Sequence, residues 1–204
     1  MPRLYFIRHG ETDWNREGRL QGRTDTALNA RGREQASIVA RHLGEIMPSP
    51  ADESLLKGLP FHASPMRRTR QTVEILRGSL GLDPLGYAPD DRLREIGFGA
   101  WEGRTWHEVR ARDPIGTRER ERNRWTYQPP GGESYAMVME RVSDWFSGIR
   151  EDSCVVAHGG IARVMMVLCG GMTPENAVTA DIWQGKVLVF SKGSMRWMPA
   201  PGHA

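Results

Sequence analysis

The sequence predicts an α/β fold whose central sheet is largely parallel. Two short apolar runs, 4–7 and 153–157, each lead into a histidine followed by a glycine, as buried strands do when they end at a sheet edge. Amphipathic helical patterns alternate with such runs, which is the arrangement of a parallel sheet. The chain of 204 residues can form one sizeable core, so we expect a single domain over residues 1–204.

The first half of the chain supplies four of these elements. The run 4–7 is predicted to be a buried strand. Asn29 can cap the next helix, because the apolar residues that follow it share one helical face: Ala36, Val39, Ala40, Leu43 and Ile46. Residues 61–63 are predicted to form a short strand. Ser64 is then expected to cap a second helix, with Pro65 at its first position.

The second half is less regular at its start. Residues 97–131 contain glycines, prolines and several aromatic residues, so we interpret them as an excursion with short helices that covers a site. A helix follows with an apolar stripe of Val138, Val142, Trp145, Phe146 and Ile149. The run 153–157 is the second buried strand, and a helix continues from it to Cys169. The tail is predicted to be a hairpin that turns at residues 192–193.

Composition excludes several classes of protein. No apolar run approaches the roughly 18 residues that a membrane-spanning helix needs, so no membrane association is expected. The net charge is +3, and arginines alternate with acids at 118–122 as on a solvated face, so nucleic-acid binding is not favoured. The apolar start is too short for a secretory signal, which predicts a cytoplasmic protein. Cys154 and Cys169 suit buried, reduced thiols better than a disulfide.

Arg8 and His9 stand where the first predicted strand ends. In open α/β sheets, ligands bind outside the carboxyl ends of the strands. All but three of the 28 basic residues are arginines, whose planar guanidinium favours phosphate and carboxylate. The pair therefore indicates anion chemistry, although a lone histidine after a strand is more often structural than catalytic.

Four segments together carry a family resemblance: Arg8-His9-Gly10-Glu11-Thr12, Ser64-Pro65-Met66-Arg67-Arg68, Leu93-Arg94-Glu95-Ile96 with Gly99-Ala100-Trp101-Glu102-Gly103, and His158-Gly159-Gly160. With them the chain resembles the histidine phosphatase superfamily, also called the phosphoglycerate mutase-like family, over residues 4 to about 168. Any one of these segments alone would be a moderate signal, and the set is a strong one. The resemblance implies a three-layer α/β/α sandwich and a His9 that is transiently phosphorylated.

Phosphoryl transfer needs a nucleophile in line with the leaving oxygen and positive charge around the equatorial oxygens. The resemblance makes His9 the nucleophile and Arg68 the phosphate-binding arginine of the family. We expect Arg8, Arg68 and His158 to supply the charge. A backbone carbonyl near Gly10 is expected to hold one ring nitrogen of His9, so that the other can attack.

Glu95 matches the acid of the family. It is expected to protonate the leaving alkoxide and then to accept a proton from water, which requires a carboxyl with a raised pKa. Asn15 and Gln21, with the adjacent Gly22, resemble the family's polar contacts to phosphate, but their side chains equally suit turn capping. The turn at Gly159 offers backbone N–H groups to an anion at the start of a helix.

Other polar residues near these motifs receive lesser roles. Glu11 and Glu102 are expected to be hydrogen-bond partners rather than the acid. Arg67 should point to the surface, one residue round the helix from Arg68. His107 is a candidate substrate contact within the excursion. The remaining histidines are expected to be structural or solvent-facing: His42, His62 and His203.

The predicted function is a metal-independent phosphatase that hydrolyses a phosphomonoester of a small metabolite through a phosphohistidine intermediate. No metal and no organic cofactor are expected, and a homodimer stays open. The tryptophans and arginines of residues 101–127 favour a walled pocket for a small, acidic ester over the shallow site of a phosphoprotein phosphatase.

Two further alternatives stay open. A phosphoglycerate mutase would use the same pocket, but such mutases have a longer insertion and tend to carry paired arginines where this chain has Asn123-Arg124. A non-catalytic phosphate-binding module is disfavoured, because binding alone needs neither His9 nor Glu95.

Overall fold

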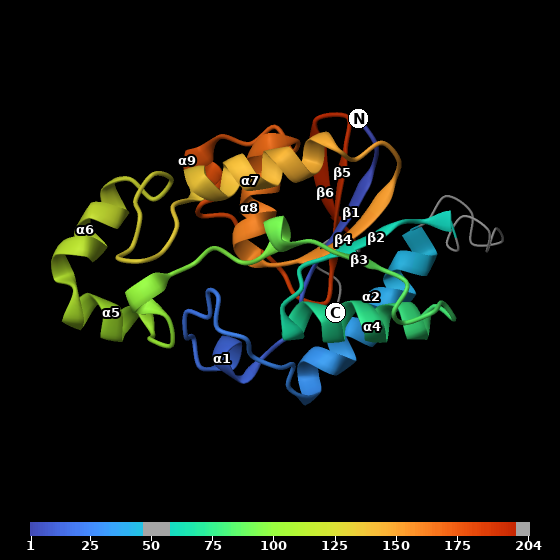
Figure 1. Cartoon of the computed structure of the whole chain (residues 1–204), viewed down its shortest axis with the longest axis horizontal. Helices are drawn as coiled ribbons and strands as arrows, with labels where there is room; N and C mark the ends of the chain where they lie inside the picture. The colour runs from blue at the N-terminus through green and yellow to red at the C-terminus, as the bar shows by residue number, and fades with distance from the viewer. Residues whose placement is uncertain (47–57, 199–204) are drawn as a thin grey trace.

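The computed structural model describes residues 1–46 and 58–198, which form three layers with a sheet in the middle (Figure 1). The strands lie in the order β3-β2-β4-β1-β5-β6. Their bounds are β1 Leu4–Arg8, β2 Phe61–Ala63, β3 Ala88–Pro89, β4 Ser153–Ala157, β5 Val187–Ser191 and β6 Ser194–Met198. The pairings among β3, β2, β4 and β1 are parallel, whereas β5 pairs antiparallel with both β1 and β6. The predicted α/β fold with a mostly parallel sheet is confirmed.

Helices cover both faces of this sheet (Figure 1). Helices α7, α8 and α9 lie on one face, and α2 and α4 lie on the other. The bounds are α1 Asp13–Arg16, α2 Ala30–Ile46, α4 Arg67–Ser79, α5 Trp106–Arg112, α6 Pro114–Arg122, α7 Tyr135–Ser147, α8 Gly159–Leu168 and α9 Pro174–Ala177, with single 3-10 turns at Asp91–Leu93 and Gly99–Trp101. This is the three-layer α/β/α arrangement that the resemblance implied.

The central strands are buried on both sides. In β1, Leu4 and Phe6 pack against the layer that contains α7 and α8, and Tyr5 and Ile7 pack against α2 and α4. Successive side chains of a strand point to opposite faces, so a strand between two helical layers must be apolar throughout. This burial holds the end of β1, and with it His9, in a fixed place.

Two predicted turns and caps agree with the structure. The Asn29 side chain accepts the N–H of Gly32 at 2.9 Å, as a residue that caps α2 should. The tail hairpin turns at Lys192 and Gly193, whose φ angles are +51° and +74°.

The predicted start of the second helix was wrong. Helix α4 begins at Arg67, and Met66, which precedes it, makes no side-chain cap. Ser64 instead places its hydroxyl 2.8 Å from Nε2 of His158. A serine before a proline suits a helix cap locally, but the distant histidine is its partner here.

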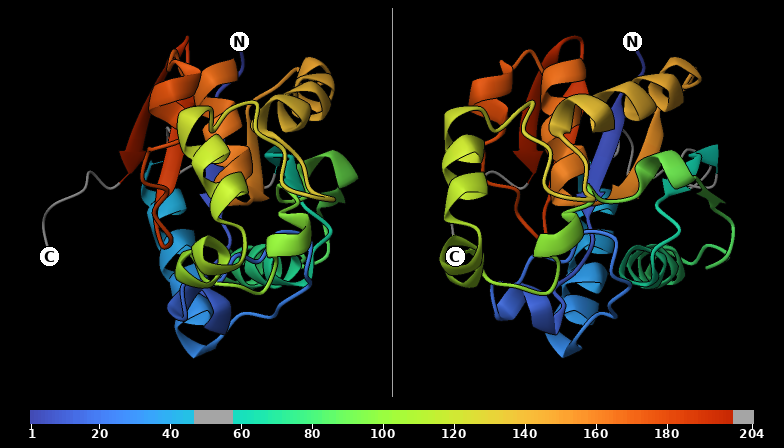
Figure 2. Two further views of the ribbon diagram at one scale, coloured as in Figure 1. Left: turned by 90° about the vertical axis from the view of Figure 1, so that its left-hand side faces the viewer. Right: turned by 60° about the vertical axis from the view of Figure 1, so that its left-hand side comes forward.

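The excursion at 97–131 contains helices α5 and α6, which stand off from one end of the three layers (Figures 1 and 2). A small separate core joins it to the loop that follows β1, through Leu20, Trp101 and Val109. Trp101 also stacks on Tyr127, with ring centroids 5.5 Å apart. The excursion is therefore attached beside the carboxyl end of β1.

Smaller predictions concern cysteines, membranes and the tail. Cys154 and Cys169 are buried and free of disulfides, as predicted. Within residues 1–46 and 58–198, no helix has the length and apolar character needed to cross a membrane. His203 lies outside the described residues.

Candidate active site

A cavity of about 180 Å³ lies at the carboxyl ends of β1 and β4. Most of the predicted site residues line it: Arg8, His9, Asn15, Gln21, Gly22, Arg68, Glu95 and Gly159. His158 does not line it, but its ring packs against that of His9 with centroids 5.3 Å apart. The fold therefore brings the distant motifs together at one edge of the sheet.

His9 follows β1 directly and is only 2% exposed. Its Nδ1 lies 2.7 Å from the backbone oxygen of Gly10, whose own N–H donates to the Thr72 hydroxyl. A carbonyl can only accept, so Nδ1 carries the ring proton and Nε2 keeps a lone pair. Burial, followed by the charges of Arg68 and Arg8, lowers the pKa of His9 well below its usual value. The imidazole is therefore neutral at neutral pH, the form that can act as a nucleophile.

Two arginines flank this histidine, one of them fully buried and the other partly buried. Arg68 is fully buried and donates to the backbone oxygens of Thr24 and Gly22 at 2.8 and 2.9 Å. Arg8 donates to the backbone oxygen of Ile182 at 2.8 Å. Burial lowers the pKa of Arg8 to about 10, which leaves it charged at neutral pH. The Nε atoms of both arginines are buried without a hydrogen-bond partner in the described part of the chain, so two charged donors can serve an anion in the cavity.

His158 differs from its predicted role. Burial, followed by the charge of Arg68, lowers the pKa of His158 well below its usual value, so the ring does not supply the predicted positive charge. Its Nε2 lies 2.8 Å from the Ser64 hydroxyl, which also accepts the N–H of Met66 at 3.5 Å. Its Nδ1 finds no partner within residues 1–46 and 58–198. His158 is thus a buried, neutral ring beside His9.

Glu95 reaches from the segment after the Asp91–Leu93 turn to the start of α8. Its Oε1 accepts the N–H groups of Ile96 and Gly160 at 2.9 and 3.0 Å. A Cβ atom at residue 160 would lie 2.7 Å from Ile96 Cγ2 and would overlap the Glu95 carboxylate. Gly160 therefore lets the carboxylate approach the helix, which holds it at the cavity wall through one oxygen.

Asn15 and Gln21 line the cavity, and both also hydrogen-bond within the loop that follows β1. The backbone N–H of Asn15 donates to the Thr12 hydroxyl at 3.2 Å, and its Oδ1 accepts the Thr12 N–H at 3.2 Å. Gln21 Oε1 accepts the hydroxyls of Thr12 and Thr26. Because these amide oxygens bind protein groups, their NH₂ groups are left to bind an anion. Gly22 has φ of +49°, in the left-handed region that glycine adopts readily.

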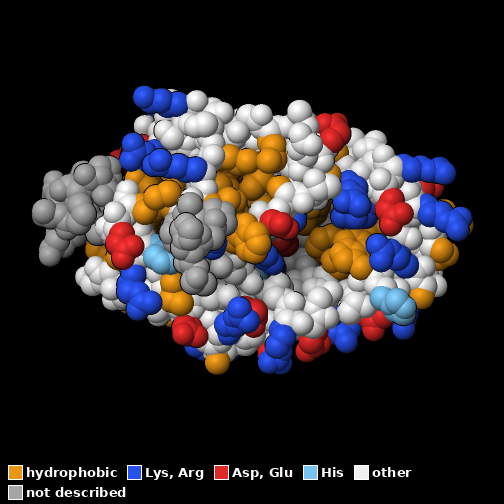
Figure 3. All heavy atoms as spheres, turned by 180° about the vertical axis from the view of Figure 1, so that it is seen from behind, with side chains coloured by type: hydrophobic (Ala, Val, Ile, Leu, Met, Phe, Trp, Pro, Cys, Tyr) orange, Lys and Arg blue, Asp and Glu red, His pale blue; other side chains and the backbone are white. Residues whose placement is uncertain are grey.

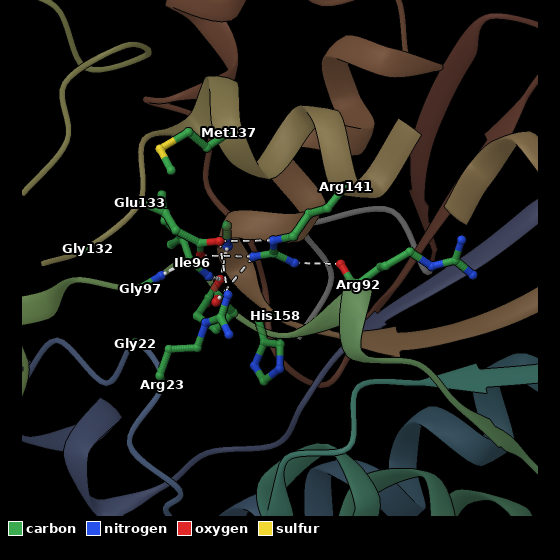
Figure 4. Close-up of polar contacts among 12 residues, drawn as sticks. Gly22, Arg23, Arg92, Ile96, Gly97, Gly132, Glu133, Met137, Arg141 and His158 are labelled. Carbon is green, nitrogen blue, oxygen red and sulfur yellow. Dashed lines mark hydrogen bonds and ion pairs between the residues drawn. The ribbon is translucent and has the colours of Figure 1, made fainter. Parts of the chain in front are cut away.

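Glu133 and Arg141 brace the segment that carries Glu95 (Figure 4). Glu133 accepts the N–H of Gly97 at 2.9 Å and a donor of Arg23 at 2.9 Å. Arg141 donates to Glu133 at 3.2 Å and to the backbone oxygen of Glu95 at 3.4 Å. Burial opposes the charged form of Glu133, but the hydrogen bonds from Gly97 and Arg141 prevail and lower its pKa. Its carboxylate therefore stays charged and links Arg141 of α7 to Arg23 and to the backbone of Gly97.

Two side chains that the motifs did not indicate also belong to the site. Arg163 on α8 lines the cavity, and its buried Nε has no hydrogen-bond partner among the described residues. It lies four residues after Gly159, so helical spacing could have indicated it. Gln184 donates to the backbone oxygen of His9 at 3.0 Å and to Asn15 Oδ1 at 3.2 Å. No pattern in the sequence distinguishes Gln184 from other polar loop residues.

The residues with lesser predicted roles lie away from the cavity. Glu11 binds the side chain of Asn29, and Glu102 accepts two backbone N–H groups; neither lines the cavity. Arg67 is exposed, as predicted. His107 is also exposed and lines neither this cavity nor the one next to it, so the structure does not support it as a substrate contact. In residues 1–46 and 58–198, no group of three or more His, Cys, Asp or Glu could hold a metal ion. The two remaining described histidines are partly buried: His42 and His62.

The cavity continues into a second, outer cavity of about 320 Å³. The two share four lining residues: Leu20, Phe98, Tyr135 and Arg163. Trp106 of α5 and Arg120 of α6 form part of the outer wall. The excursion therefore contributes walls to a pocket next to the anion site, as the sequence predicted.

Fold and site together define an α/β enzyme of phosphate chemistry, with a strand-end histidine, charged arginines and a carboxylate around one cavity. The chain belongs to the histidine phosphatase superfamily, branch 1, whose family model matches residues 4–197. The resemblance drawn from the motifs is therefore confirmed, over a longer part of the chain than they cover.

Relatives of this chain include phosphatases and a mutase. The glucosyl-3-phosphoglycerate phosphatase of Mycolicibacterium vanbaalenii is 32% identical over 98% of this chain and 84% of its own length. The probable phosphoglycerate mutase GpmB of Escherichia coli is 32% identical over 78% of this chain and 70% of its own. Among solved structures, YhfR of Bacillus stearothermophilus is 26% identical with a TM-score of 0.77, covering 100% of this chain and 98% of its own.

Proposed function

We propose that the protein hydrolyses a phosphomonoester of a small metabolite, without a metal ion, through a phosphohistidine at His9. The observation that carries the proposal is the neutral His9 at the wall of the inner cavity, with its Nε2 lone pair left free by the contact to Gly10. Arg8 and Arg68, both charged, line the same cavity. A nucleophile between two cations is what transfer of a phosphoryl group requires.

The reaction would proceed in two balanced steps. First, Nε2 of His9 attacks phosphorus, the ester P–O bond breaks, and the leaving alkoxide takes a proton from Glu95. Second, Glu95 takes a proton from water, the water oxygen attacks phosphorus, and the P–N bond breaks. Inorganic phosphate leaves, and His9 and Glu95 return to their starting states.

The surrounding donors would stabilise the transferring group. Within the described residues, the Nε atoms of Arg8, Arg68 and Arg163 are buried and have no hydrogen-bond partner. Donors in such a low-dielectric site stabilise negative charge more strongly than water does, and they need no reorganisation during the reaction. The three arginines would carry the positive charge, and the neutral ring of His158 would pack against His9.

A mutase is the second candidate, because a probable phosphoglycerate mutase is among the relatives. It would share the first step but return the phosphoryl group to a second hydroxyl instead of water. The relative named as a phosphatase covers more of this chain, which supports hydrolysis. If 3-phosphoglycerate were isomerised faster than phosphate is released, the mutase would replace the phosphatase.

The experiment that tests the proposal is a phosphate-release screen over a panel of phosphate esters in the presence of EDTA. We expect turnover by the wild type and a loss of about a thousandfold or more in His9→Ala, because the attacking atom is gone. The exposed His107→Ala is the matched control and should stay within about twofold of the wild type. Activity that requires an added divalent metal, or that persists in His9→Ala, would contradict the mechanism.

A further inference from the structure

The outer cavity is rich in arginine. Figure 3 shows the face on which basic side chains gather over the α5–α6 end of the molecule. Four arginines from three helices and the adjoining loop line the outer cavity, with a single acidic residue among the lining: Arg110, Arg120, Arg124, Arg163 and Glu121. Glu121 pairs with Arg110 at 3.6 Å. Three arginines thus face this cavity without a carboxylate partner in the described part of the chain.

Arg120 is held in place although its charge is unfavourable there. Its guanidinium carbon lies 4.3 Å from the centre of the Trp106 ring, which fixes the side chain against the cavity wall. Burial, followed by the charges of Arg124 and Arg163, lowers the pKa of Arg120. Three like charges close together in a half-buried wall repel one another. An anion between them would remove that repulsion.

Arg163 connects the two cavities. Its side chain lines both of them. Its guanidinium donates to the backbone oxygen of Ala180 at 2.9 Å, which holds the side chain in place. Its buried Nε has no partner in residues 1–46 and 58–198. A ligand whose phosphate lies at His9 would therefore extend past Arg163 toward Arg120 and Arg124.

We propose that the outer cavity binds a second anionic group of the substrate, a carboxylate or a second phosphate, between Arg120, Arg124 and Arg163. The proposal rests on the proposed function of the inner cavity, which would hold the phosphate that is transferred. Guanidinium groups bind carboxylate and phosphate through paired, charge-assisted hydrogen bonds. The substrate class is then a phosphate monoester with a second negative group, and esters without that second group are poor ligands.

Binding is measured best in the His9→Ala protein, because it should not turn the ester over during the titration. Two pairs of esters are titrated by calorimetry: 3-phosphoglycerate against glycerol 3-phosphate, and fructose 1,6-bisphosphate against fructose 6-phosphate. The first pair isolates a carboxylate, and the second isolates another phosphate. In at least one pair, we expect the ester with the second anionic group to bind about tenfold or more tightly than its partner. The pair that shows this preference identifies the group.

The same titrations are repeated with Arg120→Gln/Arg124→Gln in the His9→Ala background. The double substitution should remove most of the preference and leave the binding of glycerol 3-phosphate and fructose 6-phosphate within about twofold. Arg118→Gln is the matched control, because Arg118 is an exposed arginine on the same helix and lines neither cavity. It should keep the full preference. Equal binding within both pairs, or a preference that survives the double substitution, would overturn the proposal.

Hydrolysis by the otherwise wild-type chain separates this proposal from the proposed function. In Arg120→Gln/Arg124→Gln we expect kcat/KM to fall about tenfold or more for the preferred ester with two anionic groups and to change little for its partner, which has only the phosphate. Turnover of both esters at equal rates would refute the anionic subsite and leave the phosphatase intact. Selective binding without any turnover would refute the phosphatase and leave the subsite intact.

Discussion

At the scale of single residues, the neutral state of His9 and His158 has a cost that depends on pH. Burial and the nearby arginines lower both pKa values well below the unfolded value of about 6.5. Below that pH the unfolded chain takes up protons that the folded chain does not. The surroundings that make His9 a nucleophile therefore make the fold less stable in acid.

We expect the free energy of unfolding to fall between about pH 6.5 and 5.5, by up to about 1.4 kcal/mol per pH unit for each histidine. Replacing one of them, in His158→Asn, should make this dependence shallower. Guanidinium unfolding at several pH values measures both slopes. His62, whose pKa is also lowered by burial, is common to both proteins and cancels in the comparison. Equal slopes would show that His158 is protonated to the same extent in both states.

The roles of single residues could be predicted only where the chemistry is local. The contact between His9 and Gly10 involves adjacent residues, so the sequence predicted the tautomer correctly. The state of His158 depends on complete burial and on Arg68, which is distant in sequence. Nothing in the neighbouring residues shows that burial, and the charge prediction for His158 was wrong.

At the scale of elements, the first turn of α8 determines where the proposed acid lies. Gly160 donates its N–H to Glu95, and a side chain at this position would overlap that carboxylate. The sequence predicted the strand before the glycines and the helix after them, and it indicated that this turn binds an anion. It did not reveal that the N–H of Gly160 binds the Glu95 carboxylate. That bond spans 65 residues and requires the fold.

Gly160→Ala should therefore reduce kcat by about tenfold or more, because the displaced Glu95 can no longer deliver a proton in line. Gly44→Ala on α2 is the matched control, since the nearest atom to its added Cβ is 3.9 Å away. The control should keep its activity and gain up to about 1 kcal/mol of stability from helix propensity. Hydrolysis rates and thermal unfolding of the two variants make the comparison. Full activity in a folded Gly160→Ala protein would show that Glu95 is not held through this turn.

At the scale of the whole molecule, one sheet carries two cores on opposite faces. Val155 of β4 belongs to the core with α7 and α8, and its neighbour Val156 belongs to the core with α2 and α4; both are fully buried. The alternation of strands and helices in the sequence predicted this plan. The sequence also predicted that the excursion covers a site, but it did not reveal the contacts of Leu20 with Trp101 and Val109 that attach α5 and α6 there.

Val155→Ala and Val156→Ala should each cost about 2 kcal/mol of unfolding free energy, from lost apolar contact and the cavity that remains. Because the two side chains face different layers, the costs should add within about 0.5 kcal/mol in the double variant. Denaturant unfolding measures all three. A cost for one valine only would show that one helical layer contributes little to the stability of the sheet.

The central claim is that His9 carries the phosphoryl group, and trapping that group tests it most directly. With p-nitrophenyl phosphate, whose leaving group needs no proton, Glu95→Gln should still be phosphorylated but should lose the base for hydrolysis. After rapid quenching at alkaline pH, mass spectrometry should find one added phosphoryl group on the peptide that contains His9, and none in His9→Ala. Turnover by the wild type without any adduct, or an adduct on another residue, would contradict the claim.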